Sequence, residues 1–372
     1  MKYKLRDAFG RQFKKMENSM KFVHISDVYL GAQPDPGREW SETRKKELYE
    51  SFDRIIKICV EEKAGLLMIA GNLFCDQPTV EDLADIDERL LKLDKTRTVI
   101  LCGSRDYMGP DSAYRNFVFK SKTVVLPGGK TSNAYLKGIN TCVTGFSYEK
   151  PEYKEAVIDE ISPGREDAIN ILLACGGDQM HMPFDRKKLA RKGFDYVALG
   201  GSLKPAHILK DRMAYSGSLE PLSHKDTGRH GYILGEVEDG KVSIKWVPCN
   251  KRSYVNLSID VSSGISDEGL RDAIVERVRK LGFDNIYTIT YTGLVDARPD
   301  INLKKISERY NIYEVIDKTV LRGDIENAAA QHSGDLVGAF CRANAELSDV
   351  DDVTKEKMTM YGIKAMSFAG ER

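Results

Sequence analysis

Residues 22–31, FVHISDVYLG, and residues 66–74, LLMIAGNLF, decide the fold of this chain of 372 residues. Each stretch begins with an apolar run of strand length and then reaches a polar residue, Asp27 in the first and Asn72 in the second. Between them, residues 44–62 carry apolar side chains at helical spacing. A strand, a helix and a second strand in this order predict a parallel sheet of the α/β class.

The same alternation continues along the chain. Further strands are predicted at residues 98–102, 169–174 and 196–199, and a further helix at 80–93. In such sheets, ligands bind in the crevice beyond the carboxyl ends of the strands. The residues that stand at those ends are Asp27, Asn72, Ser104, Cys175 and Gly201. We therefore expect one site there.

The C-terminal third has a different pattern. Short strands with turns are expected over 213–247, followed by a strand at 254–261, a helix at 267–281 and a strand at 286–291. The predicted organisation has four parts: a basic, flexible N-terminal extension (1–19), a large α/β domain (20–250), a small β-α-β capping domain (251–298) and a helical segment (299–372). Leu5, Phe9 and Phe13 recur there at the spacing of a weak amphipathic helix. Otherwise the extension is a frayed tail, or results from an upstream start codon chosen in error, since Met20 directly precedes the first strand.

Charge and cysteine content narrow the function classes. Lys and Arg together number 56, as do Asp and Glu, so contact with nucleic acid would need a local basic patch. The seven cysteines are scattered and form no C-x-x-C pair, which argues against a zinc ribbon and favours a reducing cytoplasm. The apolar runs are too short to cross a membrane.

Five strand-end motifs resemble those of the calcineurin-like metallophosphoesterases, and more closely the bacterial SbcD-type (YhaO-like) DNA repair exonucleases. They are His24 to Gly31, Ile69 to Phe74, Cys102 to Tyr107, Leu172 to Asp178 and Ala198 to Pro205. The resemblance implies an α-β-β-α sandwich of four layers, a small α+β capping domain and a helical C-terminal segment. It also implies two Mn²⁺ ions in the active members, because a pair of divalent cations supports in-line attack on a phosphodiester.

The metal ligands that the resemblance implies are mostly replaced. Asp27 is the one ligand retained. The other ligand positions hold Tyr29, Asn72, Ser104, Cys175, Gly201 and Leu203. The position of the catalytic histidine holds Arg105.

These replacements have a physical consequence of their own. Neutral Asn72 cannot bridge two cations as a carboxylate does, and the guanidinium of Arg105 keeps its proton at pH 7. At a separation of ~4 Å and an effective dielectric of about 20, two like unit charges repel by roughly 4 kcal/mol. We therefore expect no cofactor and no intact catalytic residue.

Several residues near the site have simpler interpretations. Asp27 could be a turn residue or a partner of Arg105, and Cys175 either a soft-metal ligand or a buried thiol. Asp106 and Asp178 are expected to cap loops, and His24 to form a hydrogen bond in the core. The basic residues that could contact phosphate are Arg105, Lys204, Arg186 and Lys187. The last two belong to a basic cluster that is more typical of a solvated helix face.

Three hypotheses for the function stay open. The first is an inactive phosphoesterase subunit that binds DNA ends or serves as a scaffold for a coiled-coil ATPase of the SbcC type. Its docking faces would include Leu336, Phe340, Tyr361, Ile363 and Met366. The second is an active 3′-to-5′ exonuclease with one metal held by Asp27, Cys175 and Asp178, and the third is an interaction module unrelated to DNA. A homodimer is expected by analogy alone.

Overall fold

The computed structural model describes residues 19–261, 266–296 and 309–369. The predicted N-terminal extension lies outside the described residues, apart from Ser19. Contacts divide the chain into two compact units, 1–251 and 252–372, which are described separately. The predicted α/β fold class is confirmed.

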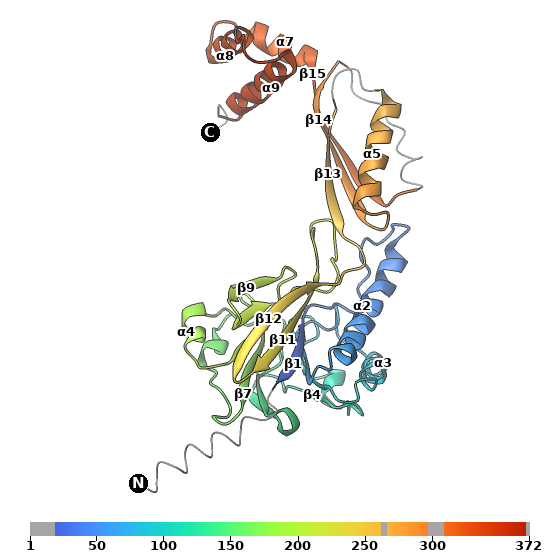
Figure 1. The fold of residues 1–372 in the computed structure, drawn as a ribbon, viewed down its shortest axis with the longest axis vertical. Coiled ribbons are helices and arrows are strands. Elements are labelled where there is room, and N and C mark those ends of the chain that lie inside the picture. Colours follow the sequence, from blue (N-terminus) through green and yellow to red (C-terminus); the bar gives the residue numbers. More distant parts are fainter. Residues whose placement is uncertain (1–18, 262–265, 297–308, 370–372) are drawn as a thin grey trace. The chain divides into compact units, whose positions relative to one another are not determined.

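Two six-stranded sheets form the centre of the first unit (Figure 1). The first has the order β12-β11-β1-β2-β3-β4 and the second the order β5-β6-β7-β8-β10-β9. The strands of the first sheet, in chain order, are β1 (Met20–Ile25), β2 (Leu66–Ala70), β3 (Arg97–Leu101), β4 (Thr123–Val125), β11 (Gly231–Glu238) and β12 (Lys241–Pro248). Those of the second are β5 (Ser132–Leu136), β6 (Thr141–Gly145), β7 (Ile169–Cys175), β8 (Tyr196–Gly200), β9 (Ala206–Leu209) and β10 (Met213–Tyr215).

Alternation along β1 and β2 explains the layers. Phe22 and Met68 belong to a core cluster shared with residues of the second sheet, such as Leu173. Their neighbours in the chain, Val23 after Phe22 and Leu67 before Met68, belong to the cluster that includes residues of the helices α2 (Ser41–Glu61) and α3 (Val80–Leu90). Successive strand residues point to opposite faces, so the fully apolar runs predicted from sequence are buried on both sides.

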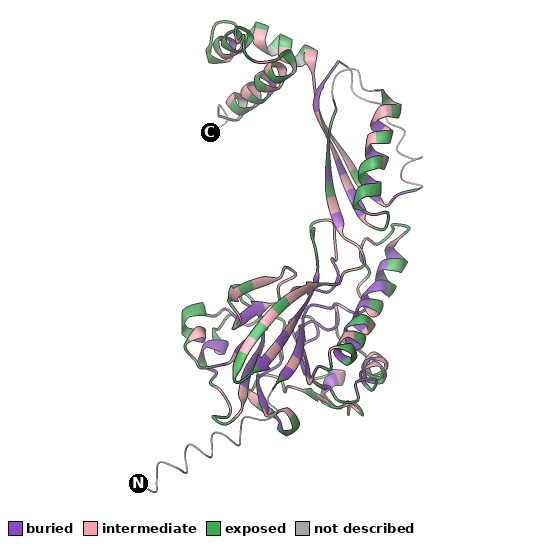
Figure 2. Cartoon of the chain, viewed as in Figure 1, coloured by how far each residue is buried: buried purple, intermediate pink, exposed green. Residues whose placement is uncertain are grey.

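Helix α2 is held to the sheet by one face. Its buried residues recur every three or four positions, as Figure 2 illustrates, and include Leu48, Phe52 and Ile55. Helix α3 starts with a capping box in which the Thr79 side chain accepts a hydrogen bond from the backbone N–H of Asp82. The smaller elements of this unit are η1 (Ala113–Arg115), η2 (Lys137–Ile139), η3 (Val157–Glu160) and α4 (Arg186–Ala190).

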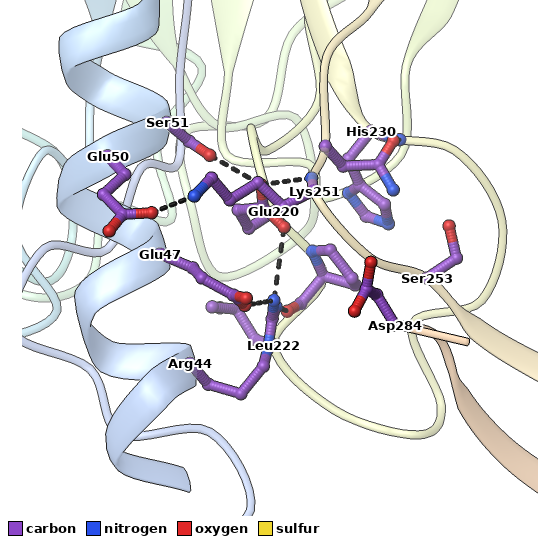
Figure 3. A network of polar contacts seen from close by, with 12 residues as sticks. Arg44, Glu47, Glu50, Ser51, Glu220, Leu222, His230, Lys251, Ser253 and Asp284 are labelled. Atoms are coloured by element: carbon purple, nitrogen blue, oxygen red, sulfur yellow. Dashed lines mark hydrogen bonds and ion pairs between the residues drawn. The ribbon is translucent and has the colours of Figure 1, made fainter. Parts of the chain in front are cut away.

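A buried charged network ties α2 to the loop after β10 (Figure 3). Arg44 is fully buried, and its guanidinium contacts the carboxylates of Glu47 at 2.5 Å and Glu220 at 3.3 Å. Glu220 also accepts hydrogen bonds from the hydroxyl of Ser51 at 2.6 Å and from the backbone N–H of Lys251 at 2.7 Å. Burial raises the pKa of Glu220. Removal of any one of these charged side chains would therefore leave a buried charge without its partner, which is strongly destabilising.

The second unit contains a parallel sheet with the order β13-β14-β15. Its strands are β13 (Tyr254–Asp260), β14 (Ile286–Val295) and β15 (Ile312–Leu321), and α5 (Asp267–Leu281) connects the first two. The helices α7 (Arg322–Gln331), α8 (Leu336–Ala345) and α9 (Asp352–Ala369) follow.

Strand β15 corrects the sequence analysis, which expected residues 299–372 to be mainly helical and the capping domain to end at 298. The strand pairs with β14 from Ile312 to Leu321, so the sheet extends past that boundary. Its residues are mostly half-buried or exposed and carry several charged side chains, which weakened the strand pattern.

Candidate functional site

The loops that follow β1, β2, β3, β7 and β8 meet at one edge of the two sheets, as the sequence predicted. They line a pocket of about 340 Å³ with Tyr29, Asn72, Ser104, Arg105, Cys175 and Gly201, together with Pro151, Glu152, Gly176, Asp178 and His181. Asp27 lies beneath it and is only 1% exposed. Leu203, Lys204, Arg186 and Lys187 are not among the lining residues.

The backbone of these loops is strained. Asp27, Tyr29 and Asn72 have φ values of 52°, 54° and 52°, in the left-handed region that residues other than glycine rarely adopt. Such strain persists only where the surrounding structure enforces it, and it concentrates at functional sites. The loops at these strand ends therefore have the strained backbone that is typical of a functional site.

Protein groups satisfy both oxygens of the Asp27 carboxylate. Oδ1 accepts a hydrogen bond of 2.8 Å from Nδ2 of Asn72, and Oδ2 accepts one of 2.8 Å from the backbone N–H of Gly201. Burial raises the pKa of Asp27, whereas these hydrogen bonds act in the opposite direction. Asp27 is thus a fixed structural acceptor, and its observed partners are Asn72 and Gly201 rather than the Arg105 side chain considered from the sequence.

Asn72 connects two loops through its side chain. While Nδ2 donates to Asp27, Oδ1 accepts a hydrogen bond of 3.0 Å from the backbone N–H of Arg105. An ionised aspartate could accept the bond from Arg105 but could not donate to Asp27. The amide group is therefore matched to an acidic neighbour in the absence of a cation.

The space around these groups is filled by close packing. A Cβ atom added to Gly71 would lie 2.6 Å from Sγ of Cys175, and one added to Gly201 would lie 2.8 Å from the backbone nitrogen of Gly176. Burial raises the pKa of the Cys175 thiol well above its usual value, so the thiol is protonated at neutral pH. An imidazole at Gly201 would not fit unless the loops moved.

This donor set does not fit a pair of divalent cations. Among residues 19–261, 266–296 and 309–369, no group of three or more His, Cys, Asp or Glu side chains is arranged to hold a metal ion. In the pocket floor, both oxygens of the Asp27 carboxylate already accept hydrogen bonds, and Asn72 directs its N–H donor toward that carboxylate. The Cys175 thiol is protonated and so is a poor metal ligand.

Arg105 and the neighbouring acids have distinct roles. Arg105 is exposed at the mouth of the pocket, and Gln77 donates a hydrogen bond of 3.0 Å to its backbone carbonyl. Asp106 accepts hydrogen bonds from the backbone N–H groups of Gly103 and Phe74, which confirms it as a loop cap. Asp178 accepts hydrogen bonds from the backbone N–H groups of Met180 and His181, which confirms the same role for it.

The remaining candidate residues lie elsewhere. His24 is buried and its Nδ1 is 2.9 Å from the hydroxyl of Tyr196, as expected for a core histidine. Lys204 forms an ion pair of 2.8 Å with Asp226. Arg186 and Lys187 are exposed at the start of α4, whose N-cap is Asp185.

Comparison with known proteins gives relatives of low identity. The DNA double-strand break repair protein Mre11 of Methanocaldococcus jannaschii is 28% identical over 238 residues, which are 58% of this chain and 62% of that protein. The metallophosphoesterase YhaO of Bacillus subtilis, named as uncharacterized, is 22% identical over 72% of this chain and 69% of its own length. The Mre11 protein of Sulfolobus acidocaldarius is 23% identical over 79% and 82%.

The chain is similar to metallophosphoesterases and to DNA repair proteins. No family model matches it. The similarities support a place in the superfamily of metallophosphoesterases and DNA repair nucleases. The match to the Methanocaldococcus protein covers less than two thirds of that protein's length. No helix in the described part of the chain combines the length and hydrophobicity needed to cross a bilayer.

Proposed function

We propose that this chain is a phosphoesterase-fold protein without nuclease activity, which binds the phosphate groups of DNA ends and associates with a coiled-coil ATPase of the SbcC type. The observation that carries the loss of activity is the double engagement of Asp27 by Asn72 and Gly201. With Asp27 already bonded, and with Asp178 paired with His181 and Glu152 with Lys154, the pocket does not offer a set of free carboxylates to neutralise two divalent cations.

Arg105 supports the proposed phosphate binding. Its guanidinium presents a planar set of N–H donors that matches phosphate, and it keeps its charge at any physiological pH. The Asp178 carboxylate, which also lines the pocket, lies 2.8 Å from Nδ1 of His181 and so has a polar partner of its own. No ion pair joins the Arg105 side chain to a carboxylate in the described parts of the chain. A phosphate at the mouth would supply the negative charge that pairs with this guanidinium. The DNA repair names of two relatives favour a DNA end as its source.

Fluorescence anisotropy with a labelled DNA duplex in EDTA tests this binding. Wild-type protein should bind with an affinity that falls as salt rises. Arg105→Ala should weaken binding by about tenfold, the value of one or two charge-assisted hydrogen bonds. Arg277→Ala, which removes an exposed arginine of α5, is the matched control and should leave binding unchanged. Undetectable binding at low salt would favour an interaction module unrelated to DNA.

A nuclease assay in Mn²⁺ tests the loss of activity. We expect no release of nucleotides from the 3′ end, and elemental analysis after incubation with manganese and zinc should find less than one ion per chain. Manganese-dependent 3′-to-5′ cleavage that Asp27→Ala abolishes would overturn the proposal and establish the alternative, an active exonuclease with a non-standard metal site.

Apolar side chains on α8 and α9 support the proposed ATPase partner. Leu336 is 74% exposed and Tyr361 is 60% exposed, on two helices that contact each other, so both apolar side chains are available to a partner. Ile363 and Met366 are half-buried. Phe340 is directed differently from the expectation: its ring lies so close to Gly362 that a Cβ there would be 2.1 Å away, so it joins α8 to α9.

Co-purification with the coiled-coil ATPase encoded in the same genome tests this association. Leu336→Asp combined with Tyr361→Asp should abolish it. Val118→Asp is the control, because Val118 is 83% exposed in the first unit. Retention of the ATPase by the double variant, or its absence from wild-type preparations, would contradict the proposed partner.

A further inference from the structure

A second cavity lies at the opposite edge of the sheets from the site described above. It measures about 430 Å³. Its lining residues are Ser19, Met20, Lys21, Lys63, Ala64, Gly65, Lys95, Lys137, Gly138, Ile139, Asn140 and Ile169. They come from the starts of β1 and β7 and from the segments that lead into β2, β3 and β6. The candidate site lies at the carboxyl ends of the strands, so the two pockets are separate.

The charge of this lysine-lined cavity is one-sided. Four of its lining residues are lysines, and none is an aspartate or a glutamate. Lys21 forms an ion pair of 2.8 Å with Glu62, outside the lining. No ion pair links Lys63, Lys95 or Lys137 to any residue of the described ranges. In a chain whose net charge is zero, this excess of positive charge is local and would attract an anion to the cavity.

The wall of the cavity is held in a fixed geometry. Asn140 has a left-handed φ of 46°, and its side chain accepts a hydrogen bond of 3.0 Å from the hydroxyl of Tyr135 and donates one of 3.0 Å to the carbonyl of Asp167. Lys63 also has a left-handed φ, of 55°. Asn140 caps the C-terminus of η2 and Lys63 follows the C-cap of α2, so both left-handed residues are helix terminations that fix where the loops lining the cavity begin.

Part of the lining, the apolar wall of the cavity, consists of Met20, Ile139 and Ile169. A Cβ added to Gly65 would lie 3.1 Å from Cγ2 of Ile139 and 3.3 Å from Cγ of Met20, so these two side chains pack directly over the glycine. Ile169 adds a third apolar surface to the lining. The cavity thus combines an apolar wall with ammonium groups, and its volume lies in the range of small-molecule sites.

We propose that this cavity binds a nucleoside polyphosphate. Lysine ammonium groups would hold the phosphate chain as point charges, without a metal ion, and the apolar wall would receive the base. Phosphate alone would leave that wall unused, and an uncharged nucleoside would leave the lysines unneutralised. The site is independent of the proposed function, since none of its residues lines the pocket of Arg105.

Isothermal titration calorimetry of the full chain with ATP, in EDTA, tests this site. The variant Lys63→Glu/Lys95→Glu/Lys137→Glu should weaken binding by about tenfold or more, because each removed contact is a charge-assisted hydrogen bond. The matched control is Lys92→Glu/Lys130→Glu/Lys210→Glu, which makes the same charge change at three exposed positions outside the cavity. All six lysines are exposed, so both variants should keep the wild-type melting temperature.

The control separates a site from a general charge effect. Equal weakening in the two triple variants, or no heat of binding up to millimolar ATP, would overturn the proposal. Loss of binding in the cavity variant alone supports it.

The source of the phosphate and the role of the base need separate probes. Ile139→Ser should weaken ATP binding while leaving the affinity for inorganic tripolyphosphate unchanged, a difference that a general loss of structure would not produce. Equal affinity of wild-type protein for ATP and tripolyphosphate would overturn the proposal, because the base would then contribute nothing to binding. A 5′-phosphorylated oligonucleotide that displaces ATP and binds more tightly, with the same dependence on the three lysines, would overturn a free nucleotide in favour of a nucleic acid end.

Discussion

Nδ2 of Asn72 donates a hydrogen bond of 2.8 Å to Oδ1 of Asp27, at the point where the loops after β1 and β2 meet. Both residues are buried, with exposures of 2% and 1%. In a metal-bound phosphoesterase site, two carboxylates at this distance would need cations between them. Here the neutral amide of Asn72 donates a hydrogen bond instead, and the N–H of Gly201 donates to the other oxygen of Asp27. Both carboxylate oxygens thus have partners within the protein.

Asn72→Asp should therefore destabilise the protein. Two buried carboxylates would face each other and the donor to Asp27 would be lost, at a cost of about 3 kcal/mol in the free energy of unfolding at pH 7. The loss should shrink as pH falls, because one carboxyl of the pair binds a proton once the pH drops below its raised pKa. Urea unfolding at pH 7 and pH 5 measures both effects.

The control for this variant is Asn116→Asp, the same change at an exposed position. It should alter stability by less than about 0.5 kcal/mol. A stability of Asn72→Asp equal to that of the wild type at pH 7 would show that the hydrogen bond to Asp27 is unimportant.

His24 should make the fold sensitive to acid. Burial lowers its pKa from 6.5 to about 3. The folded state therefore holds His24 neutral, and its contribution is fully present above pH 6.5 and is lost as pH falls towards 3. By pH 4 the loss is on the order of 3 kcal/mol.

Urea unfolding of His24→Gln between pH 7 and pH 4 checks this contribution. The variant should lose less stability than the wild type over that interval, whereas His207→Gln, at an exposed position, should follow the wild type. Parallel curves for wild type and His24→Gln would refute the assignment of the acid sensitivity to His24.

Arg44→Ala should cost far more than removal of an exposed cation of the same helix. It leaves the buried carboxylates of Glu47 and Glu220 without their shared partner, at a cost of about 3–5 kcal/mol. Lys57→Ala breaks an exposed ion pair with Glu61 and should cost less than about 1 kcal/mol. Chemical denaturation measures both; similar costs would indicate that water reaches the Arg44 network.

Cys175 should not react with a thiol reagent in the native protein. The structure buries Cys59, Cys102, Cys142, Cys175 and Cys249, and leaves Cys75 and Cys341 partly exposed. Titration with Ellman's reagent should show at most two fast-reacting thiols, absent in Cys75→Ser/Cys341→Ser. All remaining thiols should react in guanidinium chloride. Fast modification of Cys175 in that variant would mean that the pocket floor opens readily.

Local pattern was sufficient for the elements with fully buried faces. The strands β1, β2, β3, β7 and β8 were predicted to within about two residues because uninterrupted apolar runs end at polar or glycine residues. The short strands β4, β5, β6 and β9 were not predicted, and β15 was missed. In β4, β5 and β9 partial exposure weakens the pattern, while β6 is buried but short and contains threonine and glycine. Their pairing depends on neighbours that are distant in the chain.

The sequence by itself determined which chemical groups stand at the strand ends, among them a carboxylate at position 27, a neutral amide at position 72 and a guanidinium at position 105. Only the tertiary structure decided what those groups do. Three features join residues that are tens of positions apart in the chain. They are the hydrogen bond between Asn72 and Asp27, the close packing around Cys175, and the cavity lined by Lys63, Lys95 and Lys137. The residue types limit which hydrogen bonds and charges are available. Long-range packing decides which of these contacts form, because the sheets and loops must first bring the two partners close together.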